Sequence, residues 1–127
     1  MSFPFDPQER LIVIDAELWG PLGSGVLRLA LDTGATRTLI STGILVATGY
    51  DPPFASERVQ VTTGSGIEFA ALVILDRLFA LGQARSQFAV LGHTLPPSAG
   101  VDGLLGLDFF RGQSLTIDFR SGQVTLA

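Results

Sequence analysis

The sequence predicts a closed, barrel-like, all-β domain with one short helix near the C-terminus. Three observations support this prediction. Short segments rich in β-branched residues recur along the chain, glycine-containing turns separate them, and one segment near the end has the pattern of a helix. Eight or so short strands with a single helix fit a barrel, because closure of the sheet removes exposed strand edges.

In the first half of the chain, strand-like segments alternate with turns. Residues 11–18 are rich in β-branched side chains, and residues 26–31 alternate Leu with Arg and Ala, as a half-buried strand does. The intervening segments predict a turn at 20–25, a break of the second strand at 32–35, a strand followed by a short helical turn over 39–48, and a loop at 51–53.

The second half contains two hairpins and the helix. Residues 59–61 and 67–75 flank a glycine-tipped turn, and residues 114–119 and 124–127 flank the turn at 120–123. The remaining elements expected here are a turn at 82–83, a strand over 84–91, a proline loop at 96–97, and the helix over 104–111, which Gly112 ends.

The length and composition fit one domain. The chain has 127 residues, which is enough to bury a core but too short for two independent lobes. We expect an irregular leader over residues 1–10 and a single domain over residues 11–127. Only 16% of the residues are charged and the mean hydropathy is +0.43, so we expect a partner to cover part of the surface.

The residue inventory excludes many kinds of catalytic site. The chain has no Cys, no Lys and one His, His93. Thiol nucleophiles, disulfides, Cys-based zinc sites, Schiff-base lysines and phosphate-binding GxxxxGK loops are therefore excluded. The sequence also lacks HExxH and GxSxG motifs. Proton chemistry is left to carboxyl groups, and we expect neither a metal nor an organic cofactor.

Charge and hydropathy also limit the partners. The formal net charge is −4 and the Arg residues form no cluster, which argues against nucleic acid. The longest apolar run, Phe69–Leu75, is too short to span a membrane, and the N-terminus lacks the pattern of a signal peptide. The absence of Cys suits a cytoplasmic protein. A soluble domain cut from a membrane-anchored protein is the alternative.

The segment around Asp32 is the most informative. Asp32 directly follows a strand of Leu and Ala, so its carboxyl group is expected at the rim of the core. Thr33 offers a hydroxyl, and Gly34 allows the backbone to turn so that amide N–H groups approach the carboxylate. These residues form a suitable cradle for a working carboxylate. An Asp that merely caps a strand end in an Asx-turn has the same residues around it.

Two later features follow this motif in a recognisable order. They are the glycine-tipped hairpin at residues 62–66 and the Gly-Leu-Leu-Gly-Leu-Asp-Phe-Phe segment at residues 103–110. Together with the final Leu-Thr-Ile-Asp-Phe strand, they resemble the retropepsin-type aspartic proteases. The resemblance is to their cellular branch, namely the bacterial aspartyl proteases and the eukaryotic DNA-damage-inducible ubiquitin-shuttle type. It covers roughly residues 11–127.

The resemblance implies an acid-protease barrel that forms a homodimer and cleaves peptide or protein substrates. Aspartic proteolysis needs two carboxyl groups about 3 Å apart that share a proton. One accepts a proton from the attacking water, and the other donates to the peptide carbonyl oxygen. The chain has one Asp-Thr-Gly, so the resemblance implies that Asp32 of each subunit meets its copy on a two-fold axis.

The resemblance also implies roles for the neighbouring residues. Asp32 is the catalytic residue, Thr33 hydrogen-bonds across the axis, and Gly34 and Ala35 line the cleft. Four residues at the tip of a closing flap complete the expected substrate-binding set, namely Thr63, Gly64, Ser65 and Gly66.

Two positions raise further questions. Asp108 is expected to be structural and able to pair with Arg37, which stands where viral relatives carry an acid. This difference leaves open which substrate charge the cleft prefers. His93 is expected to be solvent-exposed.

Three alternatives remain at this stage. The chain could be a peptide-binding module on the same fold that never assembles the carboxyl pair, because a fold does not determine a function. It could also be a structural β-domain that uses its apolar surface for assembly. The hairpin at residues 62–66 could be an ordinary exposed turn.

Overall fold

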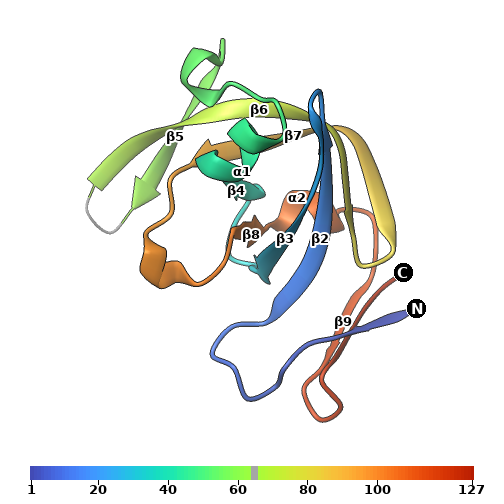
Figure 1. Cartoon of the computed structure of the whole chain (residues 1–127). Coiled ribbons are helices and arrows are strands. Elements are labelled where there is room, and N and C mark those ends of the chain that lie inside the picture. Colours follow the sequence, from blue (N-terminus) through green and yellow to red (C-terminus); the bar gives the residue numbers. More distant parts are fainter. Residues whose placement is uncertain (64–65) are drawn as a thin grey trace.

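The computed structural model of the chain describes residues 1–63 and 66–127. Strands dominate the described residues, with two α-helices and two 3-10 helices between them (Figure 1). The helical elements are α1 (Thr42–Ala47), α2 (Leu107–Phe110), η1 (Pro52–Phe54) and η2 (Pro97–Ala99). The strands are β1 (Ser2–Pro4), β2 (Val13–Gly20), β3 (Gly23–Leu31), β4 (Leu39–Ser41), β5 (Arg58–Thr63), β6 (Gly66–Ala80), β7 (Gln83–His93), β8 (Gly103–Leu105), β9 (Leu115–Asp118) and β10 (Gln123–Leu126).

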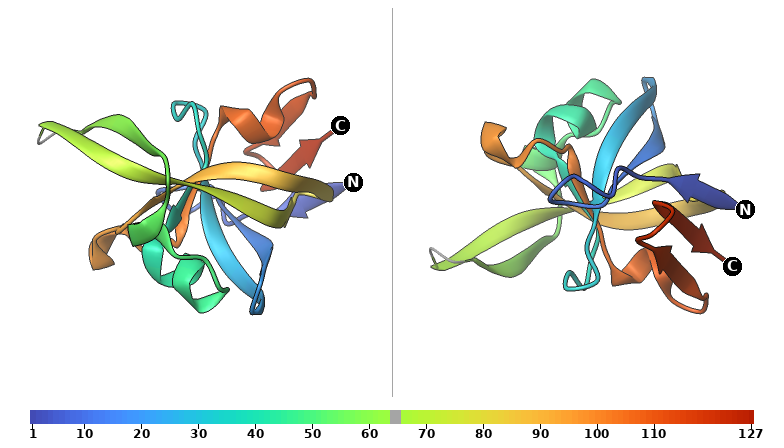
Figure 2. Two further views of the ribbon diagram at one scale, coloured as in Figure 1. Left: turned by 90° about the horizontal axis from the view of Figure 1, so that it is seen from above. Right: turned by 90° about the horizontal axis from the view of Figure 1, so that it is seen from below.

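Six strands form a closed barrel, as the sequence predicts. Their order is β2-β3-β8-β4-β7-β6, and β6 pairs back onto β2 through the register Leu18↔Leu78. The strands alternate buried and exposed residues, so one set of apolar side chains fills the interior. Leu18, Leu29 and Phe109 in this core have 0% exposure. Strand β5 pairs with β6 outside the closed ring, and the β5–β6 hairpin extends away from the barrel (Figures 1 and 2).

A separate three-stranded sheet holds both ends of the chain. Its order is β1-β10-β9, so the N-terminal and C-terminal strands are neighbours. It lies at the opposite end of the molecule from β5 (Figure 2). The prediction of a wholly irregular leader over residues 1–10 is therefore wrong at residues 2–4. These residues gain backbone hydrogen bonds from β10, a partner more than 100 residues away that local sequence cannot reveal.

The helix predicted over residues 104–111 is also wrong in its first part. Residues 103–105 form β8, which pairs in parallel with β3 and antiparallel with β4. Only Leu107–Phe110 are helical. A Cβ atom at Gly103 would lie 2.1 Å from the Leu39 carbonyl oxygen, so glycine is what lets β4 approach this closely. The short helical turn predicted after residue 39 is present as α1.

The seam that closes the barrel contains a partly buried tyrosine, Tyr50, whose hydroxyl is hydrogen-bonded on both sides. The predicted strand over residues 67–75 continues as β6 to Ala80, because its last residues pair with β2. Where that pairing ends, the Tyr50 hydroxyl donates to the Trp19 carbonyl at 2.8 Å and accepts from the Asp76 N–H at 2.7 Å. Burial is the main cause that raises the pKa of Tyr50 above its ordinary value, and the Asp76 charge adds to it.

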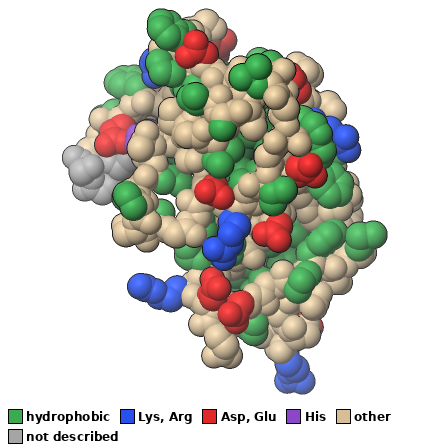
Figure 3. All heavy atoms as spheres, in the orientation of Figure 1, with side chains coloured by type: hydrophobic (Ala, Val, Ile, Leu, Met, Phe, Trp, Pro, Cys, Tyr) green, Lys and Arg blue, Asp and Glu red, His purple; other side chains and the backbone are tan. Residues whose placement is uncertain are grey.

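The surface carries charges of both signs. In the face shown in Figure 3, acidic and Arg side chains lie next to one another near the centre. Ten large hydrophobic side chains of the described residues are about half exposed or more, among them Phe54 and Phe69. No described helix is long and apolar enough to cross a membrane.

Candidate active site

Asp32 lies directly after β3, at the rim of the barrel. Its N–H donates to the Leu105 carbonyl at 3.0 Å, which ties it to β8, and its carbonyl accepts from the Ala35 N–H at 3.2 Å. The Gly34 N–H donates to Asp32 Oδ1 at 2.9 Å, so the carboxyl group is oriented by its own loop. The residue is half-buried. The backbone turn predicted around a carboxylate at Asp32-Thr-Gly is therefore present.

Gly34 gives the carboxyl group room that another residue would take. A Cβ atom at position 34 would lie 3.2 Å from Asp32 Oδ1, closer than ordinary van der Waals contact. Both Thr33 and Gly34 are exposed. Within the described ranges, the Thr33 side chain makes no hydrogen bond in the single chain. The loop thus presents a carboxyl group, a hydroxyl group and an open backbone to the surroundings.

A buried network holds this loop against α2. Thr38 has 0% exposure, and its hydroxyl donates to Asp108 Oδ1 at 2.8 Å and accepts from the Gly106 N–H at 3.1 Å. The Thr38 N–H also donates to both Asp108 oxygens at 2.9 Å. The expected pairing of Asp108 with Arg37 is therefore wrong. The Asp108 carboxylate instead accepts hydrogen bonds from the N–H and the hydroxyl of Thr38, and its structural role is to hold this residue in place.

Close backbone contact completes the support. The Leu107 N–H donates to the Ala35 carbonyl at 2.8 Å. A Cβ atom at Gly106 would lie 2.6 Å from the Arg37 carbonyl carbon, so only glycine fits between α2 and the loop. Residues 32–38 are consequently fixed from behind by the segment around Gly106.

A groove of about 350 Å³ runs from the Asp32 loop to the β5–β6 hairpin. The loop contributes Gly34 and Ala35, two of the residues expected to line a cleft, and β5 contributes residues 59–62. Apolar side chains from four different strands or loops form much of the wall, namely Leu39, Val59, Val61, Leu91 and Leu104. Polar and charged groups come from Thr36, Arg37, Gln60 and Thr62.

The predicted hairpin is present as the end of β5 and the beginning of β6. Thr63 and Gly66 face each other in the register of these strands. Gly64 and Ser65 lie outside the described residues. Of the predicted site residues, the structure therefore brings Gly34 and Ala35 to the same groove as β5, while Asp32 and Thr33 lie in the adjoining turn.

His93 differs from its predicted exposed state. Its Nε2 lies 2.7 Å from Glu68 Oε2, and its Nδ1 lies 2.9 Å from the Thr94 carbonyl oxygen. Glu68 belongs to β6 in the β5–β6 hairpin and His93 ends β7, so this pair ties the hairpin to the barrel. The sequence separation of the two residues left no local signal for the contact.

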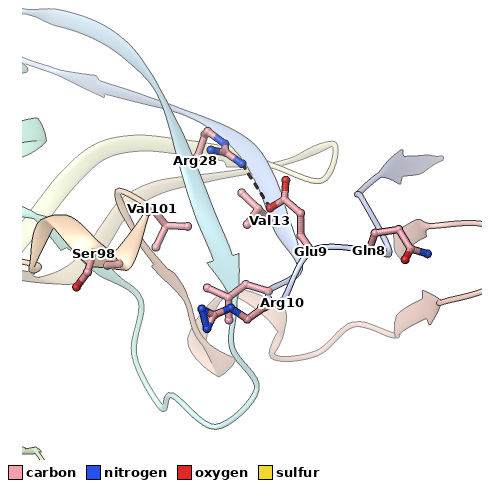
Figure 4. Close-up of a pocket in the computed structure, with 10 residues that line it drawn as sticks. Gln8, Glu9, Arg10, Val13, Arg28, Ser98 and Val101 are labelled. Carbon is pink, nitrogen blue, oxygen red and sulfur yellow. Dashed lines mark ion pairs between the residues drawn. The ribbon is translucent and has the colours of Figure 1, made fainter.

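A cavity larger than this groove lies elsewhere. It has a volume of about 610 Å³ and is lined by the N-terminal segment, by β3 and by the residues around η2 (Figure 4). Arg28 and Glu9 on its wall form an ion pair at 3.9 Å, and both side chains are about half exposed. Such a pair contributes little to stability. Because neither Asp32 nor its loop lines this cavity, its size does not make it the site.

The Asp32 turn places a carboxyl group, oriented by the Gly34 N–H, beside the groove. Among residues 1–63 and 66–127, no three His, Asp or Glu side chains gather as metal ligands would. Sequence reasoning did not find Thr38 as the anchor of the loop, nor Val59 and Leu91 as groove walls. The sequence shows the apolar alternation in the strands of Val59 and Leu91, but it does not show which strands meet at the groove.

Comparisons with known proteins agree with this geometry. Among curated proteins, no sequence matches the chain. A crystal structure of a retropepsin-like aspartic protease from Rickettsia conorii is similar over 98% of this chain and 96% of that chain, with a TM-score of 0.71 and 16% sequence identity. Likeness at this identity shows the retropepsin-like fold. The model of the family described as "gag-polyprotein putative aspartyl protease" matches residues 23–112, which include the Asp32 loop, the hairpin and α2, and the chain therefore belongs to this family of aspartyl proteases.

Proposed function

We propose that this chain is an aspartic endopeptidase whose catalytic site forms from the Asp32 carboxyl groups of two copies. The observation that carries the proposal is the geometry of the Asp32 loop. A half-buried carboxyl group is oriented by Gly34 N–H, fixed from behind by the Thr38–Asp108 network, and placed beside a groove that reaches a projecting hairpin. Family membership makes peptide hydrolysis the matching chemistry.

The dimer follows from counting carboxyl groups. A pair that shares one proton is needed, because one group must accept a proton from water while the other donates to the carbonyl oxygen. The chain has a single Asp-Thr-Gly. A two-fold axis beside the loop brings a second Asp32 to the first without any further residue. The exposed Thr33 hydroxyl, which has no partner within the described part of its own chain, is available to bond across that axis.

Substrate binding is assigned to the groove and the hairpin. In this proposal, Gly34 and Ala35 present backbone groups to the peptide, and the hairpin tip at Thr63, Gly64, Ser65 and Gly66 closes over it. Closure of such a hairpin excludes water from the reacting groups. The exposed apolar side chains supply surface that a second copy could cover. No metal or organic cofactor takes part in this mechanism.

The test is cleavage of a peptide mixture by the wild-type chain and by Asp32→Asn, from about pH 3 to pH 7, the range in which carboxyl groups change state. We expect cleavage by the wild type and a loss of at least about a thousandfold in the variant, because Asn cannot exchange the proton. Sedimentation should show that the variant remains a dimer. Equal cleavage by both proteins would exclude Asp32 as the catalyst.

The same experiment separates the proposal from a non-catalytic peptide-binding module. Such a module would bind peptides before and after Asp32→Asn and would cleave none at any pH in this range. A wild-type monomer that cleaves peptides would contradict the assembly of the site from two copies.

A further inference from the structure

Arg37 is the single charged side chain among the described residues that line the groove. The other lining residues are apolar or neutral, and none is acidic. This contrasts with the chain as a whole, which has 12 acidic residues against 8 Arg. The groove is therefore a local positive site in an acidic protein.

The Arg37 side chain is exposed and unpaired within residues 1–63 and 66–127. Neither an ion pair nor a hydrogen bond involves its guanidinium group, since Asp108 binds Thr38 instead. In the open groove, water solvates the charge. A peptide that fills the groove displaces some of this water, and a guanidinium group that loses water without gaining a partner raises the free energy of the complex.

The backbone of Arg37 is fixed in place, which makes its charge a defined feature of the groove. The next residue, Thr38, is fully buried and bound to Asp108, and the Arg37 carbonyl packs against Gly106. Because Thr38 is held inward, Arg37 is left on the exposed side of the loop, where it lines the groove. Only the side chain of Arg37 has to be ordered when a partner binds, which lowers the entropic cost.

We infer that this groove selects peptides with an acidic side chain, Glu or Asp, at the position that contacts Arg37. A carboxylate replaces the lost water and can accept two parallel hydrogen bonds from the guanidinium group. A neutral amide of the same shape accepts through one oxygen only and carries no charge. The inference rests on the proposed function and adds to it a class of substrate.

The test uses peptide mixtures in which each position in turn is fixed as Glu, Gln or Lys, and then matched single peptides at the position that discriminates. At pH 6 to 7 we expect kcat/KM for the Glu peptide to exceed that for the Gln peptide by about five- to thirtyfold. In Arg37→Gln this ratio should fall to about one, and Arg37→Glu should favour the Lys peptide. Arg120→Gln, which removes an exposed Arg outside the groove, should keep the wild-type ratio.

Two further readouts distinguish a charge effect from a general disturbance of the loop. The preference for Glu should weaken as salt is raised, and it should fade below about pH 4, where the substrate carboxyl group is protonated. A wild-type enzyme that cleaves Glu and Gln peptides equally at every position, or an Arg37→Gln variant that keeps the preference, would overturn the inference and leave the proposed function standing. Failure of the wild type to cleave any peptide would overturn both.

Discussion

Replacement of Thr38 by Val tests how the Asp32 loop is held. The two side chains have nearly the same shape, so the change removes the hydroxyl group and little else. In the structure this hydroxyl donates to Asp108 Oδ1 at 2.8 Å and accepts from the Gly106 N–H at 3.1 Å. Thr38 has 0% exposure, so water has no ready access to replace these bonds.

The expected loss of stability follows from these two bonds. A hydrogen bond to a charged acceptor contributes about 1.5–3 kcal/mol, and a buried N–H left without a partner costs about 1–3 kcal/mol. Asp108 keeps its bonds from the Thr38 N–H, which limits the loss. We therefore expect Thr38→Val to lower the free energy of unfolding by about 3 kcal/mol. This is a large part of the roughly 5–15 kcal/mol typical of a domain.

The assay is urea unfolding of both proteins at one protein concentration, since association affects apparent stability. The slope with urea should stay unchanged while the midpoint falls. Thr116→Val is the matched control, because Thr116 is exposed on β9 and should change stability by less than about 0.5 kcal/mol. If Thr38→Val lies within about 0.5 kcal/mol of the wild type, the network does not hold the loop as argued.

Three further changes probe the support of the fold. Gly106→Ala should lower the free energy of unfolding by about 2–3 kcal/mol, because its Cβ would overlap the Arg37 carbonyl. The control is Gly43→Ala in α1, which has open space around it and should be neutral or slightly stabilising in the same urea assay. Tyr50→Phe should cost about 1–2 kcal/mol at neutral pH through the lost bonds at the seam. Because the pKa of Tyr50 is raised in the folded state, its contribution should persist below about pH 10 and diminish as the pH rises through the folded value, so urea midpoints of wild type and variant should converge there. Hydrogen bonds from the N–H and hydroxyl of Ser121, followed by the Arg120 N–H, lower the pKa of Asp118. Asp118→Asn should therefore lower the free energy of unfolding at neutral pH, and this difference from the wild type should disappear as the pH falls through the folded pKa. A difference that stays unchanged in strong acid would contradict this assignment.

The sequence predicted the fold class and the Asp32 turn because their signals are local. Alternation along residues 26–31 marks a half-buried strand, and Asp-Thr-Gly marks the turn that follows it. The hairpin around residues 62–66 was likewise visible from its glycines.

The errors have long-range causes. Residues 103–105 are apolar and precede a real helical turn, so only their pairing with β3 and β4 identifies them as a strand. Residues 2–4 become a strand because β10 lies beside them. The sequence offers Arg37 as a partner for Asp108, but in the folded loop the N–H and the hydroxyl of Thr38 donate to the Asp108 carboxylate. In each case the deciding partner is distant in sequence or is a backbone group.

The assembly of the catalytic site from two copies is tested most directly by mixing subunits. Wild-type chain is mixed with Asp32→Asn in varied proportions at constant total protein, allowed to exchange, and assayed for peptide cleavage. If each active site needs two Asp32 residues, activity falls as the square of the wild-type fraction, so an equal mixture retains about one quarter of the full activity. Activity that falls in direct proportion, with about one half retained in the equal mixture, would contradict a site shared between two copies.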